Sequence, residues 1–435
     1  RTIKYIPKPG KSPDRVGNLR PLSLLESLYK LQTRVLSNRL TLTMDEIIYE
    51  NQHGFRRDRG IQTATLPVLD AIHDAGRRGQ AMQVISVDLK SAFDCVSPQL
   101  IRQVMELYKF PEIYVEALHQ LTHRGKGRLF VNSLMGNEFD IENGTGQGDP
   151  PSAGRFNIGT DPLLRALNKV TERYRYRMEM GRKMPVTAFA DDHQHVTQVG
   201  DAAHVQEILE VYSDFAKVSG LHLSIEKTVM MCINTDPDLI GEILNLTGIK
   251  QVEEFRYLGI QLCKTQEASR VASYQKVQEN IKSRYQRINS SHVDLFHRRQ
   301  LIKQTIMPSF NHVFMVFGHD EENERALDGM MVDLLWTRSC QGQVRQGRRL
   351  VAKKRLDASF NMGGLNMDKT AQLVDGLLLN MLKRLHDQSQ LPEDKRIFFY
   401  HTIDSLLVRL GAPNLEELFR LGGSRTWGDL GDRVR

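Results

Sequence analysis

At 435 residues the chain is too long for one ordinary domain, so we expect two to four packed units. A hydrophobic content of 40% and a charged content of 26% are typical of a globular protein, and no apolar run reaches the roughly 18 residues that span a membrane. The net charge of +7 favours a polyanionic partner, and the absence of a CxxC pair argues against a zinc knuckle or a disulfide framework.

The apolar patterning predicts alternating helices and strands through the first 263 residues, followed by a mainly helical region. It indicates an α/β or α+β body. In chain order the expected elements are a turn over 17–24, a long helix from 25, a strand over 82–89, a Ser-Pro helix start at 97–98, a hairpin over 127–144, a helix after the prolines at 150–151, a hairpin over 186–199, a helix over 201–219 and single strands over 228–234 and 255–263.

Basic residues gather in three segments that flank a nearly balanced middle. Residues 1–60 hold twelve Lys or Arg against six acids, residues 264–319 hold nine against three, and residues 337–355 hold seven with no acid. Such segments suit a protein that grips phosphates around a central site. Solvated helix faces are the alternative interpretation of any single run.

Two adjacent acids, Asp191 and Asp192, lie at the tip of the hairpin predicted over 186–199, in a turn that lacks Gly and Asn. Carboxylates about 4 Å apart repel by roughly 4 kcal/mol at an effective dielectric near 20. A third acid, Asp88, ends a predicted strand about a hundred residues earlier. If the two segments meet, the acids suit Mg²⁺, and two such ions can clamp an in-line displacement at phosphorus.

The chain resembles the reverse transcriptase domain of non-LTR (LINE-type) retrotransposons, and more distantly the group II intron reverse transcriptases. Matching motifs follow one another in family order over residues 3 to about 310: "IPKPGK…NLRPLSLLESLYKL", "NQHGFRRDRG", "VDLKSAFDCV", "NGTGQGDPPSAGRFN", "FADD", "SGLHLSIEKT" and "FRYLGIQL". The loop "GDPPS" departs from the commoner "GCPLSP" form, which affects loop detail more than chemistry.

The resemblance implies an α+β right-hand polymerase fold, with fingers, a palm built on an antiparallel sheet, and a helical thumb. The implied domains are 1–60 for the N-terminal part of the fingers, 61–263 for the remaining fingers and the palm with its catalytic motifs, 264–320 for the thumb, and 321–435 for a helical region of unclear role.

The resemblance also implies the catalytic groups. Asp88 and Asp191 match the two essential metal ligands, Asp192 supports the metal site, and Lys227 matches the lysine that protonates the leaving pyrophosphate as a general acid. The implied cofactor is a pair of Mg²⁺ ions, with Mn²⁺ as a substitute.

Four positions match the family's contacts with the incoming dNTP. Arg20 corresponds to the fingers arginine on the triphosphate, and Phe93 to the bulky side chain that clashes with a 2′-hydroxyl. Packing of Phe93 in the core is the alternative. Gln147 and Gly148 form the "QG" loop at the nucleotide.

Five further positions match contacts with nucleic acid. The template-strand residues are Arg56 and Arg57, and the primer-grip residues near the primer 3′ end are Tyr257, Leu258 and Gly259.

His193 and His195 alternate on one strand face beside the aspartates, but no third ligand at metal spacing accompanies them. We therefore expect them to line the hairpin face or to contact nucleic acid.

The function implied is that of an RNA-directed DNA polymerase engaged in target-primed reverse transcription, with an RNA template, a DNA primer and dNTPs as partners and no membrane. The retroelement lifestyle places it in the nucleus and cytoplasm. The opening "RTIKYIPKPG" reads as the middle of a longer protein, with any endonuclease elsewhere. The alternatives are a catalytically silent or domesticated nucleic-acid-binding relic and an intron-type maturase.

Overall fold

The computed structural model divides into two compact units, residues 1–64 with 74–253 and residues 65–73 with 254–435. It describes residues 1–8, 12–57, 59–123, 125–131, 133–179, 181, 183–199, 202–290, 293–340, 343–346 and 356–389. Of the helical region predicted over 321–435, residues 390–435 therefore lie outside the described part.

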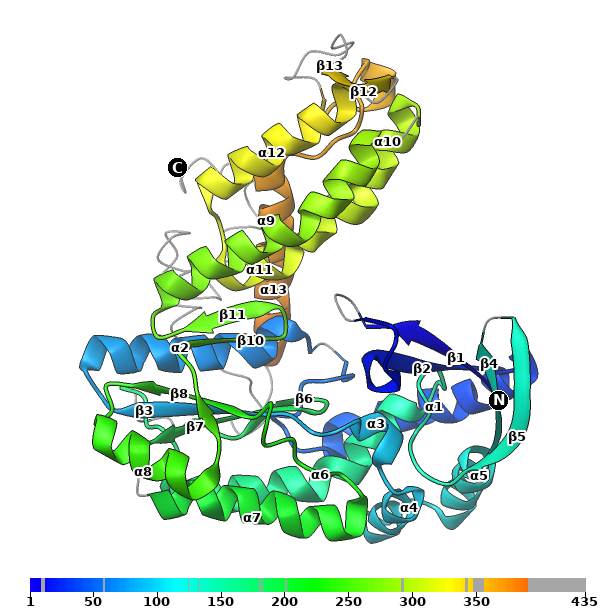
Figure 1. Ribbon diagram of the computed structural model, residues 1–435, viewed down its shortest axis with the longest axis vertical. Helices are drawn as coiled ribbons and strands as arrows, with labels where there is room; N and C mark the ends of the chain where they lie inside the picture. The colour runs from blue at the N-terminus through cyan, green and yellow to red at the C-terminus, as the bar shows by residue number, and fades with distance from the viewer. Residues whose placement is uncertain are drawn as a thin grey trace. The chain divides into compact units, whose positions relative to one another are not determined.

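The first unit is built on a five-stranded sheet of order β6-β7-β3-β8-β9 (Figure 1). Its strands are Thr187–Phe189, Asp192–Gln198, Met82–Val87, Val229–Ile233 and Lys250–Gln251. The central strand, β3, pairs antiparallel with β7 and β8. Its sequence "MQVISV" is buried nearly throughout, as the short apolar run predicts.

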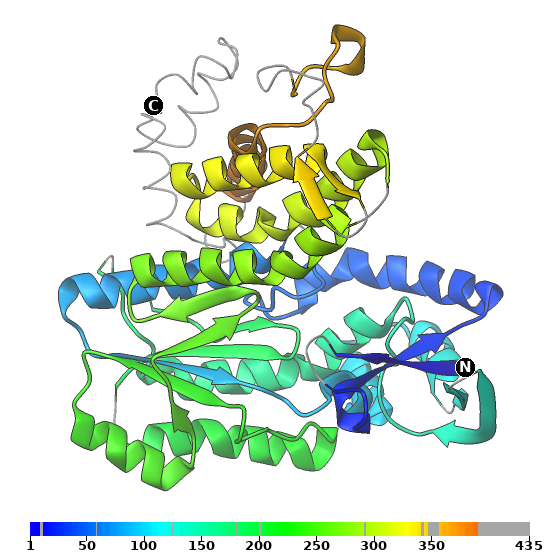
Figure 2. The same ribbon diagram turned by 45° about the horizontal axis from the view of Figure 1, so that its top comes forward.

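Helices α6 (Ser152–Val170), α7 (Ala202–Ser219) and α8 (Pro237–Thr247) cover one face of this sheet (Figures 1 and 2). Local signals explain where several helices of this unit begin and end. α4 starts at Pro98, where the Ser97 hydroxyl accepts a hydrogen bond from Leu100 N, and α8 ends at Gly248 with a left-handed φ. The unit also holds α4 (Pro98–Leu107), which packs beside α6, and α5 (Glu112–Thr122), which packs beside α4. Their apolar faces join β3 in one buried core.

A second sheet of order β2-β1-β4-β5 lies in the same unit. Residues 19–24, predicted as part of a turn, form edge strand β2 instead, because Leu19–Leu24 pairs in register with Thr2–Pro7. Pro21 is tolerated there because an edge strand needs no donor on its outer side. The elements are β1 (Thr2–Pro7), β2 (Leu19–Leu24), β4 (Gly125–Val131), β5 (Leu134–Ile141) and the following helix α1 (Ser27–Ile47).

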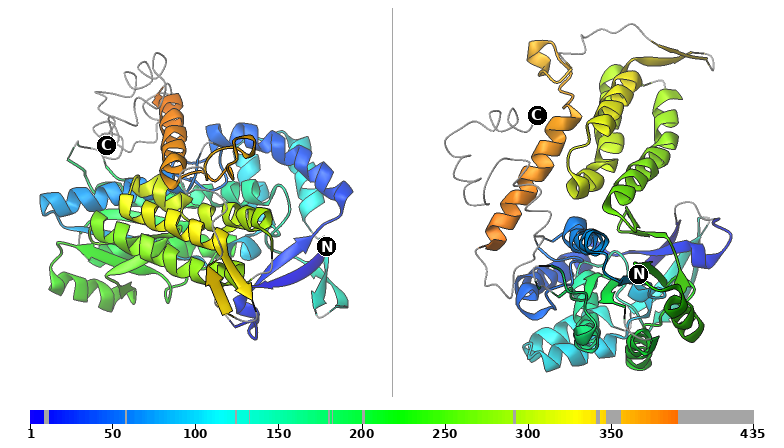
Figure 3. Two further views of the ribbon diagram at one scale, coloured as in Figure 1. Left: turned by 90° about the horizontal axis from the view of Figure 1, so that it is seen from above. Right: turned by 90° about the vertical axis from the view of Figure 1, so that its left-hand side faces the viewer.

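The second unit is mainly helical, as expected (Figures 1 and 3). The single strand predicted over 255–263 is wrong: it is a hairpin of β10 (Glu254–Tyr257) and β11 (Ile260–Cys263) that turns at Leu258 and Gly259, both with positive φ. The described helices are α9 (Gln266–Ser290), α10 (Leu295–Leu301), α11 (Asn311–Phe317), α12 (Glu321–Trp336) and α13 (Thr370–Ser389), with a short hairpin of β12 (Thr337–Cys340) and β13 (Gln343–Gln346).

Two further helices flank β3 in the sequence. The short helix α3 (Ala92–Cys95) follows β3, and the 18-residue helix α2 (Ile61–Arg78), which was not predicted, precedes it. Among the described residues, no helix is both long enough and apolar enough to cross a bilayer.

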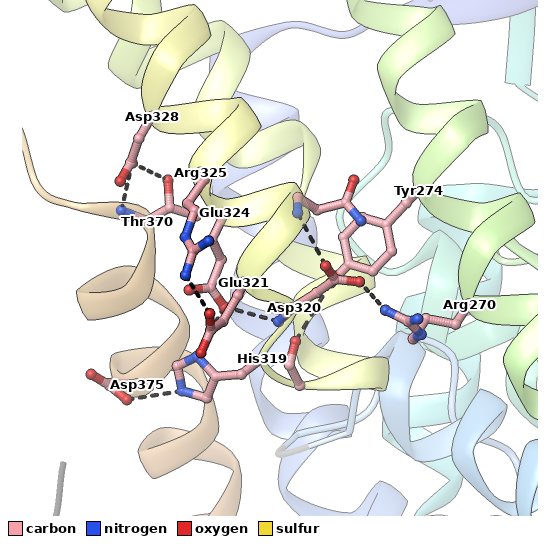
Figure 4. A network of polar contacts seen from close by, with 12 residues as sticks. Arg270, Tyr274, His319, Asp320, Glu321, Glu324, Arg325, Asp328, Thr370 and Asp375 are labelled. Carbon is pink, nitrogen blue, oxygen red and sulfur yellow. Dashed lines mark hydrogen bonds and ion pairs between the residues drawn. The ribbon is translucent and has the colours of Figure 1, made fainter. Parts of the chain in front are cut away.

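A polar network in the second unit links α12 and α13 to the turn before α12 (Figure 4). His319 Nδ1 lies 2.9 Å from Glu324 Oε1, and its Nε2 lies 3.0 Å from Asp375 Oδ1. Its hydrogen bond to Glu324 raises the pKa of His319 above the ordinary value. Protonated His319 therefore bonds two carboxylates from different helices at once.

We expect this network to stabilise the protein below about pH 6.5, the ordinary histidine pKa, and to lose that contribution as the pH rises through the raised folded-state pKa. A partly exposed pair contributes at most about 1 kcal/mol, which corresponds to about 2–4 °C in Tm. Thermal unfolding at pH 6 and pH 8.5 checks this. The Tm difference between the two pH values should shrink in His319→Gln, and an unchanged difference would contradict the assignment.

Candidate active site

The sheet register brings the three predicted acids to one edge. Val87, the last residue of β3, pairs with His193 on β7, so the next residue, Asp88, falls opposite Asp192. The β6–β7 hairpin closes with Phe189 paired to Asp192, which leaves Asp191 in a two-residue turn. The two segments, about a hundred residues apart in the sequence, therefore meet.

Electrostatics confirm how crowded these acids are. Burial and then the charge of Asp88 raise the pKa of Asp191, whereas Lys227 lowers it. Desolvation, Asp191 and Asp88 raise the pKa of Asp192 to about 7. Because Asp192 is exposed to solvent, the charges of Asp191 and Asp88 raise its pKa more than burial does.

The turn that carries Asp191 is strained. Ala190, its first residue, has φ 57°, a left-handed conformation that costs an L-residue roughly 1–2 kcal/mol. Two-residue hairpin turns with positive φ at this position usually carry Gly. Strain of this kind persists where surrounding contacts over-determine the backbone, often at functional sites.

Lys227 reaches the same edge through the segment after α7. Ser224 N donates to the Asp88 carbonyl at 2.9 Å, and Leu223 bridges Leu89, so this segment runs beside the end of β3. Lys227 Nζ lies 2.9 Å from Asp88 Oδ2, with side-chain exposures of 60% and 36%. An ion pair this exposed adds little stability, so the lysine is free to exchange partners.

Hydrogen bonds on both sides hold the "GTGQG" loop. Thr145 N donates to the Phe93 carbonyl at 2.8 Å, and Ser23 N on β2 donates to the Gln147 carbonyl at 2.8 Å. Gly148 has φ 104°, and a Cβ there would lie 2.8 Å from the Ser23 carbonyl oxygen, so only glycine fits. The loop thus joins the Phe93 segment to β2.

Arg20 and Phe93 lie on the two elements that this loop connects. Arg20 is exposed on β2 opposite Ile6, and within the described chain its guanidinium has no hydrogen-bond or ion-pair partner. Phe93 is half-buried. Its ring stacks on that of Phe156 with the ring centroids 4.2 Å apart, and it meets the Phe55 ring edge-on with the centroids 5.8 Å apart. Packing therefore fixes the Phe93 ring while part of it stays exposed.

The predicted contact of Arg56 with the template strand is wrong, because the structure buries its side chain. Its side chain is 1% exposed, forms a 2.8 Å ion pair with Asp45 and donates to the Tyr49 carbonyl at 2.9 Å. A guanidinium enclosed in this way joins α1 to the following loop and is not available to a template phosphate. Arg57 is exposed, and its template contact stays a prediction.

The predicted primer-grip residues form the β10–β11 turn of the second unit. Tyr257 is buried at 2% exposure, whereas Leu258 and Gly259 are half-buried. A Cβ on Gly259 would lie 3.0 Å from His312 Nε2, which explains the glycine. Their contact with the primer end stays a prediction.

The two histidines beside the acids point into the protein. His193 Nδ1 and His195 Nε2 each lie 2.9 Å from the Tyr212 hydroxyl. Burial lowers the pKa of His193 to about 4 and that of His195 to about 3, so both are neutral at pH 7. The expectation that they line the hairpin is confirmed, and the alternative contact with nucleic acid is wrong.

Sequence reasoning missed a buried polar group beneath the "GDPPSAGR" segment. Tyr29 on α1 donates to Asp149 Oδ2 at 2.8 Å, and Arg155 is 2% exposed, with its pKa lowered to about 10 by burial. Both charged residues were visible in the quoted motif, but their burial was not.

The donor set at the acids fits a hard divalent cation. As the side chains stand, no three His, Cys, Asp or Glu residues of the described ranges are grouped to hold an ion. The chemistry still fits, because Asp88 and Asp191 offer only oxygen donors and their mutual repulsion is what a cation relieves.

Residues 6–262 match the family model described as "Reverse transcriptase (RNA-dependent DNA polymerase)". A 149 kDa protein of transposon TX1 from Xenopus laevis is 27% identical over 227 residues, covering 50% of this chain and 17% of that protein. The Pol polyprotein of the type-2 retrotransposable element R2DM of Drosophila melanogaster is 25% identical, covering 61% of this chain and 25% of the relative.

The RNA-directed DNA polymerase from the mobile element jockey of Drosophila funebris is 25% identical, covering 73% of this chain and 35% of the relative. The chain thus spans about a sixth to about a third of the length of these relatives. Among solved structures, apo telomerase from Candida tropicalis covers 91% of this chain and 68% of its own, at 11% identity and a TM-score of 0.46.

Proposed function

The chain belongs to the reverse transcriptase (RNA-dependent DNA polymerase) family, and from that premise we propose that it extends a primer 3′-hydroxyl with dNTPs on an RNA template. The observation that carries the proposal is the convergence of Asp88 with Asp191 and Asp192 at one sheet edge. Curated relatives named as RNA-directed DNA polymerases support the same reaction.

Asp88 and Asp191 would hold the divalent ions, with Asp192 in support, and Mg²⁺ or Mn²⁺ suits their oxygen donors. Bound ions of this kind stabilise the attacking and leaving oxygens of a displacement at phosphorus. Lys227 would donate a proton from Nζ to the leaving pyrophosphate as a general acid. Its exposed side chain has to leave Asp88 Oδ2 to do so.

The nucleotide-binding roles follow from the positions around the "GTGQG" loop. Arg20, exposed on β2, would pair its guanidinium with the triphosphate. Gln147 and the closely approached backbone of Gly148 would contact the nucleotide. The Phe93 ring, fixed by stacking on Phe156, would exclude a 2′-hydroxyl and so select deoxynucleotides.

The wider biological role is also a proposal, because the chain matches only part of its relatives. We infer that it serves target-primed reverse transcription of a retroelement RNA, with a DNA primer, in the nucleus and cytoplasm. The three basic segments support a nucleic-acid partner.

Primer extension on poly(rA)–oligo(dT) with Mg²⁺ tests the proposal. We expect extension with dTTP, little with UTP, and none when the divalent ion is chelated. A chain that binds the duplex without extending it in either Mg²⁺ or Mn²⁺ would contradict the proposal and favour a nucleic-acid-binding relic.

A further inference from the structure

One buried side chain forms hydrogen bonds with the backbone of the strained residue Ala190. Gln52 is fully buried, and its Nε2 donates to the Ala190 carbonyl at 3.1 Å. Its Oε1 accepts from Ala190 N at 2.8 Å. The side-chain amide thus satisfies both backbone groups of the residue that precedes Asp191.

The segment that carries Gln52 is itself fixed against the edge strand β6. Ala188 N donates to the Asn51 carbonyl at 2.9 Å, and His53 N donates to the Ala188 carbonyl at 2.7 Å. Gln52 Oε1 also accepts from Gly54 N at 2.9 Å. The amide therefore has a defined orientation, because its oxygen faces two N–H donors and its nitrogen faces a carbonyl.

Gly54 shows how closely the two segments approach. A Cβ at this position would lie 2.4 Å from Ala190 N, closer than any side chain can come. Asn157 Nδ2 on α6 donates to the Gly54 carbonyl at 2.8 Å, which holds the segment from its other side. The glycine thus lets the backbone carry Gln52 up to the turn.

His193 supplies a second donor to the same carbonyl. Its Nε2 lies 3.2 Å from the Ala190 oxygen, and because a carbonyl only accepts, this nitrogen carries the proton. Nδ1 then accepts from the Tyr212 hydroxyl at 2.9 Å. The Ala190 carbonyl is therefore held by both Gln52 and His193, and the Ala190 N–H is held by Gln52.

We propose that Gln52 is a positioning residue that holds Ala190 in its left-handed conformation and so aims the Asp191 carboxylate at the reacting groups. This inference rests on the proposed function, in which Asp191 holds a divalent ion. Gln52 itself touches no reactant: it acts through the Ala190 backbone.

Gln52→Met tests the proposal, because methionine keeps the length and approximate volume of glutamine but lacks the amide. We expect kcat for primer extension to fall about 100-fold, as misplacements of about 1 Å can cost. The KM for dTTP and the affinity for the primer–template should change by less than about threefold, since the binding groups lie elsewhere. The Mg²⁺ concentration for half-maximal rate should rise.

Gln83→Met is the matched control. Gln83 is also fully buried, lies on β3 at the end remote from Asp88, and donates to Thr197 Oγ1 at 3.1 Å. Both variants should lower Tm, but Gln83→Met should keep kcat within about threefold of the parent. Equal kcat in the two variants would overturn the proposal. If Gln52→Met does not fold, Gln52→Asn, which keeps the amide but is too short for both contacts, should show the same kcat loss.

Adding Ala190→Gly to Gln52→Met gives a rescue test. Glycine adopts a positive φ without the hydrogen bonds from Gln52, so kcat should recover about tenfold relative to Gln52→Met alone. No recovery would contradict the role of Ala190 strain. A parent chain without polymerase activity would instead overturn the proposed function. In that case hydrogen exchange at the Ala190 amide still decides the matter: it should accelerate in Gln52→Met and not in Gln83→Met.

Discussion

Asp191→Asn should lower the rate of primer extension by at least about 10³-fold, because metal-ion stabilisation supplies several kcal/mol and each 1.36 kcal/mol is a factor of ten. Asparagine keeps the shape of the side chain and removes its charge. The loss should appear in kcat, with the affinity for primer–template within about threefold of the parent. Single-turnover extension and filter binding on the same duplex measure the two quantities.

The stability of Asp191→Asn separates a chemical effect from misfolding. Burial and Asp88 raise the pKa of Asp191, so the ionised group destabilises the folded state above its unfolded pKa near 4. Its neutral replacement should therefore leave Tm at pH 7 unchanged or higher. Asp214→Asn is a suitable control, since Asp214 is exposed on α7 and its carboxylate lies 2.7 Å from Lys217 Nζ. Loss of activity together with a fall in Tm of several degrees would contradict this reasoning.

Lys227→Ala should lower kcat by about 10²- to 10⁴-fold, the usual contribution of a general acid. The ion pair with Asp88 is exposed on both sides, so its loss should leave Tm almost unchanged. Lys227→Arg keeps the charge but releases a proton far less readily, so it should not recover the kcat that Lys227→Ala loses.

Lys217→Ala removes a comparable lysine from an exposed pair on α7 and serves as the control. Rapid chemical quench with a single incoming dTTP isolates the chemical step. A Lys227→Ala chain that reacts at the parent rate would show that water, and not this lysine, protonates the pyrophosphate.

Local signals made parts of the fold predictable from sequence. The Ser97–Pro98 start of α4, the buried β3 and the β6–β7 hairpin all follow from patterns within a few residues. The expected α+β right-hand polymerase class is confirmed, and it follows from the family of the matched region. The residue bounds of the fingers, palm and thumb stay a prediction.

Other long-range contacts leave no local signal in the sequence, apart from the meeting of Asp88 with Asp191 that the family motifs imply. β2 was predicted as a turn because its partner β1 lies across a loop in the sequence. The β10–β11 hairpin was predicted as a single strand because its turn interrupts a run of mainly apolar residues. The charge of Arg56 suggested a phosphate contact, although its side chain is buried and paired with Asp45. The partnership of Gln52 with Ala190 joins residues 138 positions apart, and only the fold reveals it.

The central claim is that Asp88 and Asp191 act as one metal-dependent unit in RNA-templated DNA synthesis. Single-turnover extension of oligo(dT) on poly(rA) with dTTP and Mg²⁺ tests it most directly, on the parent, Asp88→Asn, Asp191→Asn and the double variant. Groups that act together are strongly non-additive, so we predict that each single variant loses at least about 10³-fold and that the double variant is no slower than either. A single variant that extends at the parent rate would contradict the account.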